Sequence, residues 1–589
     1  MSSEKSDTVS LLDLAAALPG MALDAPGMLR NVLGMLVRPG DRASVGLFFQ
    51  RRAHRHPQRE FLRFEGRGYT YQRANAEVNR FAHVLADRGV GRGDVVGVLC
   101  GNRPEALLIA LATVKLGATV GLLNHNQRGA VLAHSLGLLD SVVTVVGEEC
   151  AGALDSLDEP VRNAMSVGEL LDAAEHADPA DPPICAKITA RERAFLIFTS
   201  GTTGMPKASV MTHLRWTKSM SGLGGLGIRL RGDDVLYCPL PLYHNNALTV
   251  ALSAVLANGA TYALGRKFSA SGFWDEVIRE KATGFVYIGE LCRYLLNQPP
   301  KPTDREHRIR LAVGNGLRPE LWDEFSQRFG IRRIVEFYGA SEAPLAFVNA
   351  FGVDRTAGFG PLPYAIVDYD EQTGHARRGK NDRVRRVGSG GVGLLLAKVT
   401  GRQPFDGYTD AEATEAKLVR DAFRDGDTWF DTGDLVRDQG WRHIAFVDRL
   451  GDTFRWKGEN VATTEVEGAL TDAAGIEQAV VYGVPIPGAD GKAGMAAVTL
   501  REGAEFDGRA LAETAYTRLP SYAVPLFVRV VGALEQTSTF KSRKVELREQ
   551  GYEPDDDSAL YVLAGRTEGY VPAYDDYPAK VAAAELPAD

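Results

Sequence analysis

The chain has 589 residues, of which 45% are apolar and 24% are charged, and its formal net charge is −8. This length requires more than one hydrophobic core, and the ordinary composition excludes a disordered chain, a collagen-like fibre and a coiled-coil rod. The acidic balance argues against a nucleic-acid partner. The five cysteines are scattered without CxxC spacing, which argues against a disulfide framework or a zinc site and fits a reducing cytoplasm.

Residues 1–43 are predicted to form a separate N-terminal segment with one short helix. Apolar residues recur at helical spacing from Met28 to Leu36, between Pro26 and Pro39. Two interpretations remain open: the helix packs on the main body, or it lies on a membrane surface with the help of Arg30. No uncharged apolar run reaches about 18 residues, so no membrane span is expected. The predicted location is the cytoplasm, with peripheral contact at the inner face of the cell membrane as the second interpretation.

Residues 44–450 alternate short apolar strands with helices. This alternation predicts an α/β fold, in which parallel sheets are covered by helices on both faces. Residues 155–183 and the basic run 371–391 are interpreted as surface insertions, the second as a solvated loop or as a contact for an anionic group. The predicted strands are Asp94–Cys100, Ala118–Leu123, Asp140–Val146, Ala194–Phe198, Phe285–Ile288, Ile309–Val313 and Ile334–Phe337.

Residues 451–589 differ in texture from the rest of the chain. Strand-like runs at Ala479–Tyr482 and Ala496–Leu500 indicate a small α+β C-terminal domain. The tail after Tyr552 is acidic and rich in alanine and proline, so it is expected to be loosely held.

The strongest local signal follows the predicted strand that ends at Phe198. Backbone N–H groups and hydroxyls of a Gly/Ser/Thr loop can surround phosphate oxygens, and Lys207 adds a positive charge. The loop is not a Walker A motif, because Pro206 precedes the lysine and Ala208 follows it. It reads Thr199-Ser200-Gly201-Thr202-Thr203-Gly204-Met205-Pro206-Lys207-Ala208. This string resembles the phosphate-loop signature of the adenylate-forming superfamily, which includes acyl-CoA synthetases, luciferases and peptide-synthetase adenylation domains.

Two later strings resemble the next motifs of that superfamily. The first, Pro239-Leu240-Pro241-Leu242-Tyr243-His244, implies that His244 lies beside the acyl pocket. The second, Tyr338-Gly339-Ala340-Ser341-Glu342, resembles the YGxTE signature with serine in place of threonine. The resemblance makes Glu342 the magnesium ligand, and a carboxylate oxygen suits Mg²⁺ shared with nucleotide phosphates.

The string Trp429–Asp434 resembles the motif that binds the ribose. It assigns Asp434 to the ribose hydroxyls, whose hydrogen bonds a carboxylate can accept. In the motif that begins at Asp448, the resemblance places Arg449 on the nucleotide and Gly451 at a hinge between domains, where many relatives carry aspartate or lysine. Glycine tolerates the large backbone rotations that a hinge needs.

Two more matches complete the series. Gly458, in the string Arg455–Asn460, matches a glycine whose backbone lines the route of the thiol acceptor. Thr537-Ser538-Thr539-Phe540-Lys541 resembles the C-terminal motif that ends in the catalytic lysine. A desolvated cation at Lys541 would stabilise the transition state electrostatically.

Three further strings resemble one branch, the fatty acid transport protein and very-long-chain acyl-CoA synthetase family. They are Tyr287–Leu296, Gly314-Asn315-Gly316-Leu317-Arg318-Pro319 and Tyr482–Met495. The resemblance places Gly314, Asn315 and Gly316 at the ligand pocket and implies a long or very long fatty acid as substrate.

The resemblance implies a two-step reaction that uses ATP, Mg²⁺ and coenzyme A. A fatty carboxylate attacks the α-phosphorus of Mg·ATP to form acyl-adenylate and pyrophosphate, and the thiol of coenzyme A then displaces AMP. The implied catalytic residues are Thr199, Lys207, His244, Glu342 and Lys541. Two alternatives remain open: an acyl-AMP ligase that loads a carrier protein, and a lipid-uptake or membrane-binding component with weak ligase activity. The oligomeric state is not predicted.

Overall fold

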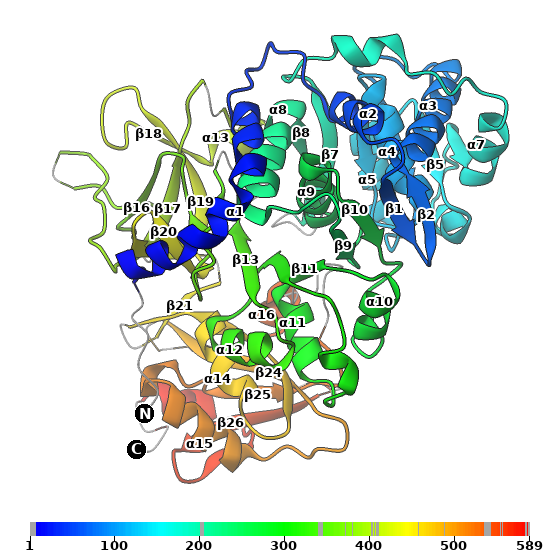
Figure 1. Cartoon of the computed structure of the whole chain (residues 1–589). Coiled ribbons are helices and arrows are strands. Elements are labelled where there is room, and N and C mark those ends of the chain that lie inside the picture. The colour runs from blue at the N-terminus through cyan, green and yellow to red at the C-terminus, as the bar shows by residue number, and fades with distance from the viewer. Residues whose placement is uncertain are drawn as a thin grey trace.

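The computed structural model in Figure 1 shows a large N-terminal body and a smaller C-terminal part, coloured orange to red. From Phe454 onward the chain has its own sheet and its own hydrophobic core. The predicted α/β class is confirmed, while the exact domain limits stay a prediction. The structure describes residues 8–200, 205–339, 345–370, 373–379, 381–401, 404–405, 407, 411–450, 452–456, 459–487, 489, 491–534, 544–553, 555, 558–583 and 586.

A six-stranded sheet has the order β6-β5-β3-β4-β7-β8. Neighbouring strands are parallel except β8, which folds back on β7. The four predicted strands of this region are confirmed. Residues 155–183 are more than a surface insertion, because they supply edge strand β6 and helix α7 with the buried Leu170. The elements are α3 (Tyr71–Asp87), β3 (Val95–Leu99), α4 (Pro104–Lys115), β4 (Thr119–Leu122), α5 (Gly129–Leu139), β5 (Val143–Val146), η1 (Glu148–Cys150), α6 (Ala151–Leu154), β6 (Ala164–Ser166), α7 (Val167–Ala174), η2 (Pro183–Lys187), β7 (Arg193–Ser200), β8 (Pro206–Thr212) and α8 (His213–Ser219).

A second, larger sheet begins with six parallel strands in the order β1-β10-β9-β11-β12-β13, and β2 is antiparallel at its edge. Its predicted strands are confirmed. Two π-helical segments, η3 and η4, pack against each other and against α9 beside this sheet. The elements are α2 (Val45–Arg55), β1 (Glu60–Phe64), β2 (Arg67–Thr70), η3 (Met220–Ile228), β9 (Val235–Cys238), η4 (Asn246–Ala251), α9 (Leu252–Asn258), β10 (Thr261–Leu264), α10 (Phe273–Arg279), β11 (Gly284–Ile288), α11 (Gly289–Leu296), η5 (Pro302–Asp304), β12 (Leu311–Asn315), α12 (Pro319–Arg328) and β13 (Arg333–Tyr338).

The same sheet continues past β13 as antiparallel strands, seen at the left of Figure 1. The basic run 371–391 lies beside these strands at the surface, and its arginines contact nearby segments of the same domain. Arg378 donates to the Arg420 carbonyl at 2.7 Å, and Arg385 pairs with Asp368 at 2.7 Å. The elements are β14 (Phe347–Val348), β15 (Gly358–Phe359), β16 (Tyr364–Val367), β17 (Val392–Lys398), α13 (Ala411–Glu415), β18 (Leu418–Arg420), β19 (Thr428–Gly440) and β20 (His443–Arg449).

The C-terminal part contains a five-stranded sheet in the order β23-β24-β25-β26-β27. The prediction that the tail after Tyr552 is loosely held is wrong, because the apolar run Ala559–Gly565 pairs with β25 and the Tyr577 side chain is fully buried. The elements are β21 (Phe454–Trp456), β22 (Glu459–Val461), α14 (Thr463–Thr471), β23 (Ile476–Pro485), β24 (Lys492–Leu500), α15 (Gly508–Arg518), η6 (Ser521–Ala523), β25 (Phe527–Val530), α16 (Lys544–Gln550), β26 (Ala559–Gly565), β27 (Gly569–Pro572) and α17 (Tyr577–Ala582).

The N-terminal helix α1 (Leu11–Met35) is longer than the predicted helix. A capping box at Ser10 starts it, and the prediction that Pro26 precedes the helix is wrong, since Pro19 and Pro26 both lie inside it. Both prolines are exposed, so water can hydrate the carbonyl groups that they leave unpaired. The helix packs on η3 and α8, and no described helix, α1 included, is long and apolar enough to cross a bilayer.

A buried lysine joins helices α3 and α4 to the chain after α7. The Lys115 ammonium is inaccessible to water and donates to the side chains of Asn75, Asn79 and Asp181 at 2.8, 2.6 and 2.7 Å. A buried charge is tolerated only when it is paired and hydrogen-bonded, and here three acceptors surround the ammonium.

We expect the Lys115→Ala substitution to lower the free energy of unfolding of the N-terminal body by about 3–5 kcal/mol, because it removes the buried ammonium that three side-chain acceptors surround. Denaturant unfolding followed by tryptophan fluorescence measures this change. Lys187→Ala, at an exposed position on η2, is the matched control and should change stability little. Equal stability of the two variants would contradict the structural role of Lys115.

Candidate functional site

Three strands of the larger sheet end at one edge and carry predicted site residues there. β11, β12 and β13 are parallel, with Ile288 opposite Asn315 and Gly314 opposite Glu336. The carboxyl ends of parallel strands are where α/β proteins bind ligands. The pairing places Gly314, Asn315 and Gly316 at the same sheet edge as Tyr338, and their role in ligand binding stays a prediction.

A buried carboxylate joins these strand ends. Glu336 on β13 accepts hydrogen bonds from the Tyr287 hydroxyl (2.7 Å), the Leu317 N–H (2.8 Å) and the Gly316 N–H (3.1 Å). Gly316 has a φ of +83°, which favours glycine at this turn. Burial raises the Glu336 pKa to about 8 despite the three donors. Sequence reasoning missed this residue, although a carboxylate inside an apolar strand was a usable signal.

The predicted histidine loop lies beside the same edge. The Asn246 amide, two residues after His244, donates to the Asn315 side chain at 2.9 Å. Asn102 holds the loop in place, because its amide donates to the Leu240 carbonyl and its oxygen accepts the Leu242 N–H, both at 2.9 Å. The π-helical η4 begins at Asn246, and such segments are frequent at functional sites.

A third group of predicted residues continues from β13 to β19 and β20. The Tyr338 hydroxyl donates to Asp434 at 2.5 Å, and the Arg449 guanidinium lies 3.7 Å from the same carboxylate. Asp434 and Arg449 are register partners on β19 and β20. Asp434 is 8% exposed and Arg449 is largely exposed, so a buried acceptor sits beside an accessible cation. This pair can bind hydroxyl groups and an anion side by side.

The structure describes the phosphate loop only in part. Thr199 and Lys207 are register partners on β7 and β8, which places the lysine opposite the end of β7. The side chains of Thr199 and Ser200 lie outside the description, as do the predicted residues Gly201, Thr202, Thr203, Gly204, Ala340, Ser341, Glu342, Gly451, Gly458 and Lys541.

Helix α16 begins three residues after Lys541 and is anchored on α14. The Lys544 ammonium lies 2.8 Å from the Glu467 carboxylate and donates to the Thr463 hydroxyl at 2.7 Å. Glu467 also faces Arg318 of the N-terminal body at 3.3 Å. Glu467 therefore contacts both Lys544, which begins α16, and Arg318, which lies two residues after Gly316.

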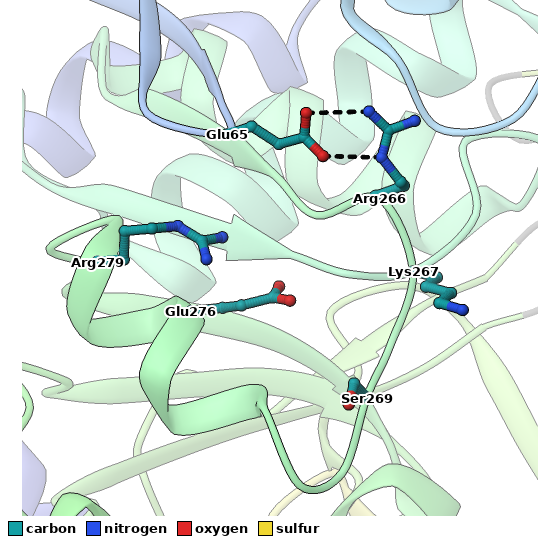
Figure 2. Close-up of a pocket in the computed structure, with 6 residues that line it drawn as sticks. All are labelled: Glu65, Arg266, Lys267, Ser269, Glu276 and Arg279. Carbon is teal, nitrogen blue, oxygen red and sulfur yellow. Dashed lines mark hydrogen bonds and ion pairs between the residues drawn. The ribbon is translucent and has the colours of Figure 1, made fainter.

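A separate surface hollow of about 430 Å³ lies beside the carboxyl end of β10 and contains none of the predicted residues. Figure 2 shows Glu65 and Arg266 face to face across it, joined by hydrogen bonds of 2.8 and 2.9 Å. Arg279 pairs with Glu280, and Glu276 accepts the Tyr237 hydroxyl. Because these charges are largely paired with one another, we place the candidate site at the edge of β11 to β13. The lining residues are Glu65, Arg266, Lys267, Ser269, Glu276 and Arg279.

The comparisons with known proteins match both parts of the chain to known families. Residues 49–376 match the AMP-binding enzyme family, and residues 465–541 match the AMP-binding enzyme C-terminal domain. The chain is 57% identical over 585 residues to the medium/long-chain-fatty-acid–CoA ligase FadD6 of Mycobacterium tuberculosis, covering 98% of both chains. It is 38% identical over 555 residues to the mouse long-chain fatty acid transport protein 6, covering 90% of this chain and 89% of that one.

One solved structure supports the fold. ATP-bound MatB from Rhodopseudomonas palustris superposes with a TM-score of 0.71 at 23% identity, covering 86% of this chain and 98% of that one. This similarity supports the fold alone, and it carries no argument about substrate.

We expect the wild type to lose stability relative to Glu336→Gln as the pH rises from 4.5 to about 8. The folded protein holds the Glu336 proton more tightly than the unfolded chain, whose carboxyl titrates near 4.5, so this stabilisation is present at low pH and lost through the raised pKa. Denaturant unfolding at a series of pH values measures the difference. Glu320→Gln, at an exposed position on α12, should follow the wild type. Parallel profiles for wild type and Glu336→Gln would contradict the raised pKa.

Proposed function

The chain belongs to the AMP-binding enzyme family, and on that basis we propose that it is an ATP-dependent, AMP-forming ligase that joins long-chain fatty acids to coenzyme A. The observation that carries this proposal is the 57% identity to a fatty-acid–CoA ligase along 98% of both chains. The arrangement of Tyr338, Asp434 and Arg449 supports it, because it supplies a hydroxyl-binding carboxylate and a cation at the carboxyl edge of a parallel sheet.

The nucleotide occupies the edge formed by β12, β13 and β19. Asp434 accepts hydrogen bonds from the two ribose hydroxyls, held in position by the Tyr338 hydroxyl, and Arg449 contacts the nucleotide from the next strand. The segment 314–316 at the end of β12 lies against the bound adenylate, since its two glycines let the backbone approach closely.

The phosphates and the acyl carboxylate meet between His244 and the loop that ends at Lys207. Lys207 and the hydroxyls of Thr199 and its neighbours neutralise phosphate charge, and Lys541 stabilises the negative charge that moves during adenylation. Mg²⁺, bound by Glu342 together with the phosphates, supplies further charge neutralisation at the α-phosphorus. His244 borders the acyl group that is transferred.

The second half-reaction requires a rotation of the C-terminal part about Gly451. This rotation withdraws Lys541 from the active site and brings the face that carries Gly458 toward it. Described contacts between the two parts include the ion pair of Arg318 with Glu467 at 3.3 Å and the hydrogen bond from the Arg293 guanidinium to the Glu477 carbonyl at 2.7 Å. The rotation has to break these contacts.

We further propose that the protein works in the cytoplasm and meets its substrate at the inner membrane surface. Long-chain fatty acids partition into lipid, so a ligase that touches the bilayer collects them where they are concentrated.

The purified protein should release AMP and form acyl-CoA only when a long-chain fatty acid, ATP, Mg²⁺ and coenzyme A are all present. A panel of fatty acids of graded length measures the preferred chain. Lys541→Ala should lower acyl-adenylate formation by about 10²–10³-fold and spare transfer from supplied acyl-adenylate, because only the first step needs its charge. Lys580→Ala, an exposed lysine of α17, is the control.

Two outcomes would replace this proposal. Acyl transfer to a carrier protein but not to free coenzyme A would identify an acyl-AMP ligase. Binding of fatty acid without fatty-acid-dependent AMP release would identify a lipid-uptake or membrane-binding component. Equal loss of both half-reactions in Lys541→Ala would remove the role given to that lysine.

Asp434→Asn should raise the KM for ATP by about 10–100-fold, since it weakens two hydrogen bonds to a charged acceptor worth about 1.5–3 kcal/mol each. Steady-state kinetics with varied ATP measures the change. Asp438→Asn, four residues along the same strand, is the matched control and should leave this KM unchanged. An unchanged KM in Asp434→Asn would show that the ribose binds elsewhere.

A further inference from the structure

Exposed apolar side chains concentrate on one helix of this protein. Half of the large apolar side chains that the described residues expose belong to α1 and to Leu36, which ends it. Leu29, Leu33 and Leu36 are 71%, 69% and 68% exposed. Single exposed leucines need no explanation, but a cluster on one element marks a surface that meets something other than water.

These side chains form a stripe. Leu29, Val32, Leu33 and Leu36 stand at i, i+3, i+4 and i+7, which places them on one face of a helix. Leu11 and Leu18, seven residues apart, extend the exposed apolar surface onto the first half of α1. Figure 1 shows α1 on the outside of the molecule, passing from the β19–β20 side to α8.

Two polar side chains of α1, Asp24 and Asn31, point toward the protein body, whereas Asp13 and Arg30 are exposed. Asp24 is paired with Arg229 of η3's C-terminal end at 3.2 Å, and that arginine is only 8% exposed. Asn31 is 7% exposed, and its side-chain amide donates a hydrogen bond to the Gly27 carbonyl at 2.9 Å. A surface helix usually buries its apolar face, whereas α1 exposes Leu29, Leu33 and Leu36 and turns Asp24 and Asn31 toward the body.

Close packing keeps the helix in this orientation. A methyl group at Gly225 of η3 would lie 2.1 Å from the Asn31 side chain, and one at Gly34 would lie 1.9 Å from the Ser221 hydroxyl. α1 therefore cannot roll its leucines inward without losing the contacts with η3 and the Asp24 ion pair.

Exposed arginines lie beside the apolar stripe. Arg30 lies on α1, Arg38 follows Leu36, and Arg55 and Arg59 lie at the end of α2. A methyl group at Gly27 of α1 would lie 3.8 Å from the Asn258 side chain, and one at the adjacent Gly259 would lie 3.4 Å from the His56 ring, so the C-terminal end of α2 lies near α1. Arginines that border exposed leucines match the charge and the layering of an anionic lipid surface.

We propose that the outer face of α1 docks this protein onto an anionic phospholipid surface, with Leu29, Leu33 and Leu36 in the acyl layer and the arginines at the head groups. A second copy of the chain fits this face less well, because a two-fold contact would bring the arginines of both copies together. The docked face also lies one helix away from the candidate site, since η3 packs on η4, which begins two residues after His244. That last relation, unlike the docking itself, rests on the proposed function.

Co-sedimentation of the full chain with vesicles tests the proposal. We expect binding to vesicles of phosphatidylcholine mixed with phosphatidylglycerol, and weaker binding to phosphatidylcholine alone. The triple variant Leu29→Ser, Leu33→Ser, Leu36→Ser should bind mixed vesicles roughly tenfold or more weakly, because it removes the inserted apolar area. The matched control carries Val131→Ser, Val142→Ser and Leu171→Ser, three exposed apolar residues elsewhere, and should bind like the wild type.

A second variant tests the charge contribution. Arg30→Gln, Arg55→Gln, Arg59→Gln should lose most of the preference for phosphatidylglycerol while keeping the binding to phosphatidylcholine. Fatty-acid-dependent AMP release, measured without vesicles, should be unchanged in both variants, so that a failure of the proposed ligase activity is read independently of vesicle binding.

Three results would overturn the proposal. The wild type binding neither kind of vesicle would exclude a lipid surface, and equal binding by the leucine variant would exclude this face. A dimer in lipid-free sedimentation that the leucine variant abolishes would assign the face to a second copy of the chain.

Discussion

Parallel pairing of β11, β12 and β13 brings three strand ends to one edge of the sheet, and the buried carboxylate of Glu336 ties them together. Glu336 lies on β13, and its donors come from Tyr287 on β11 and from the turn after β12, so its hydrogen bonds join all three strands. A buried carboxylate is expensive unless its oxygens are satisfied, and here the backbone of Gly316 and Leu317 supplies that satisfaction. These hydrogen bonds hold the turn at Gly316 and Leu317 against β13.

The rest of the candidate site follows from that edge. β13 ends at Tyr338, which donates to Asp434, and Asp434 is paired in register with Arg449. Arg449 is also the last residue of β20, directly before the chain enters the C-terminal part. One run of contacts therefore links the parallel strands to the segment that precedes the proposed joint.

The two surfaces that we propose as binding sites differ in polarity. The edge of β11 to β13 offers polar groups in buried positions, suited to a nucleotide. The face of α1 offers leucines to the outside and keeps Asp24 and Asn31 inside. The π-helical segments η3 and η4 lie between them, and their contact with α1 and with Asn315 connects the two sides.

The sequence alone determined the fold class, the order of the motifs and the residues at the β12, β13 and β19 edges. It could do so because apolar strand runs are local signals, and because Gly314, Tyr338 and Asp434 stand in strings specific to one superfamily. Two predictions from composition were wrong. Pro26 lies inside α1, where the helix tolerates it on its exposed side, and the short apolar run after Tyr552 is stabilised by pairing with β25.

Contacts between residues that are far apart in the sequence could be identified only in the folded structure. Glu336 acquires its role from Tyr287 and Gly316, which are separated from it by 49 and 20 residues, and no local pattern encodes such a meeting. The same holds for α1: its leucines predicted an amphipathic helix, but which face is buried depends on Arg229 and the glycines of η3. Periodicity reveals that a helix has two faces, and long-range packing selects the one that meets the solvent or the lipid.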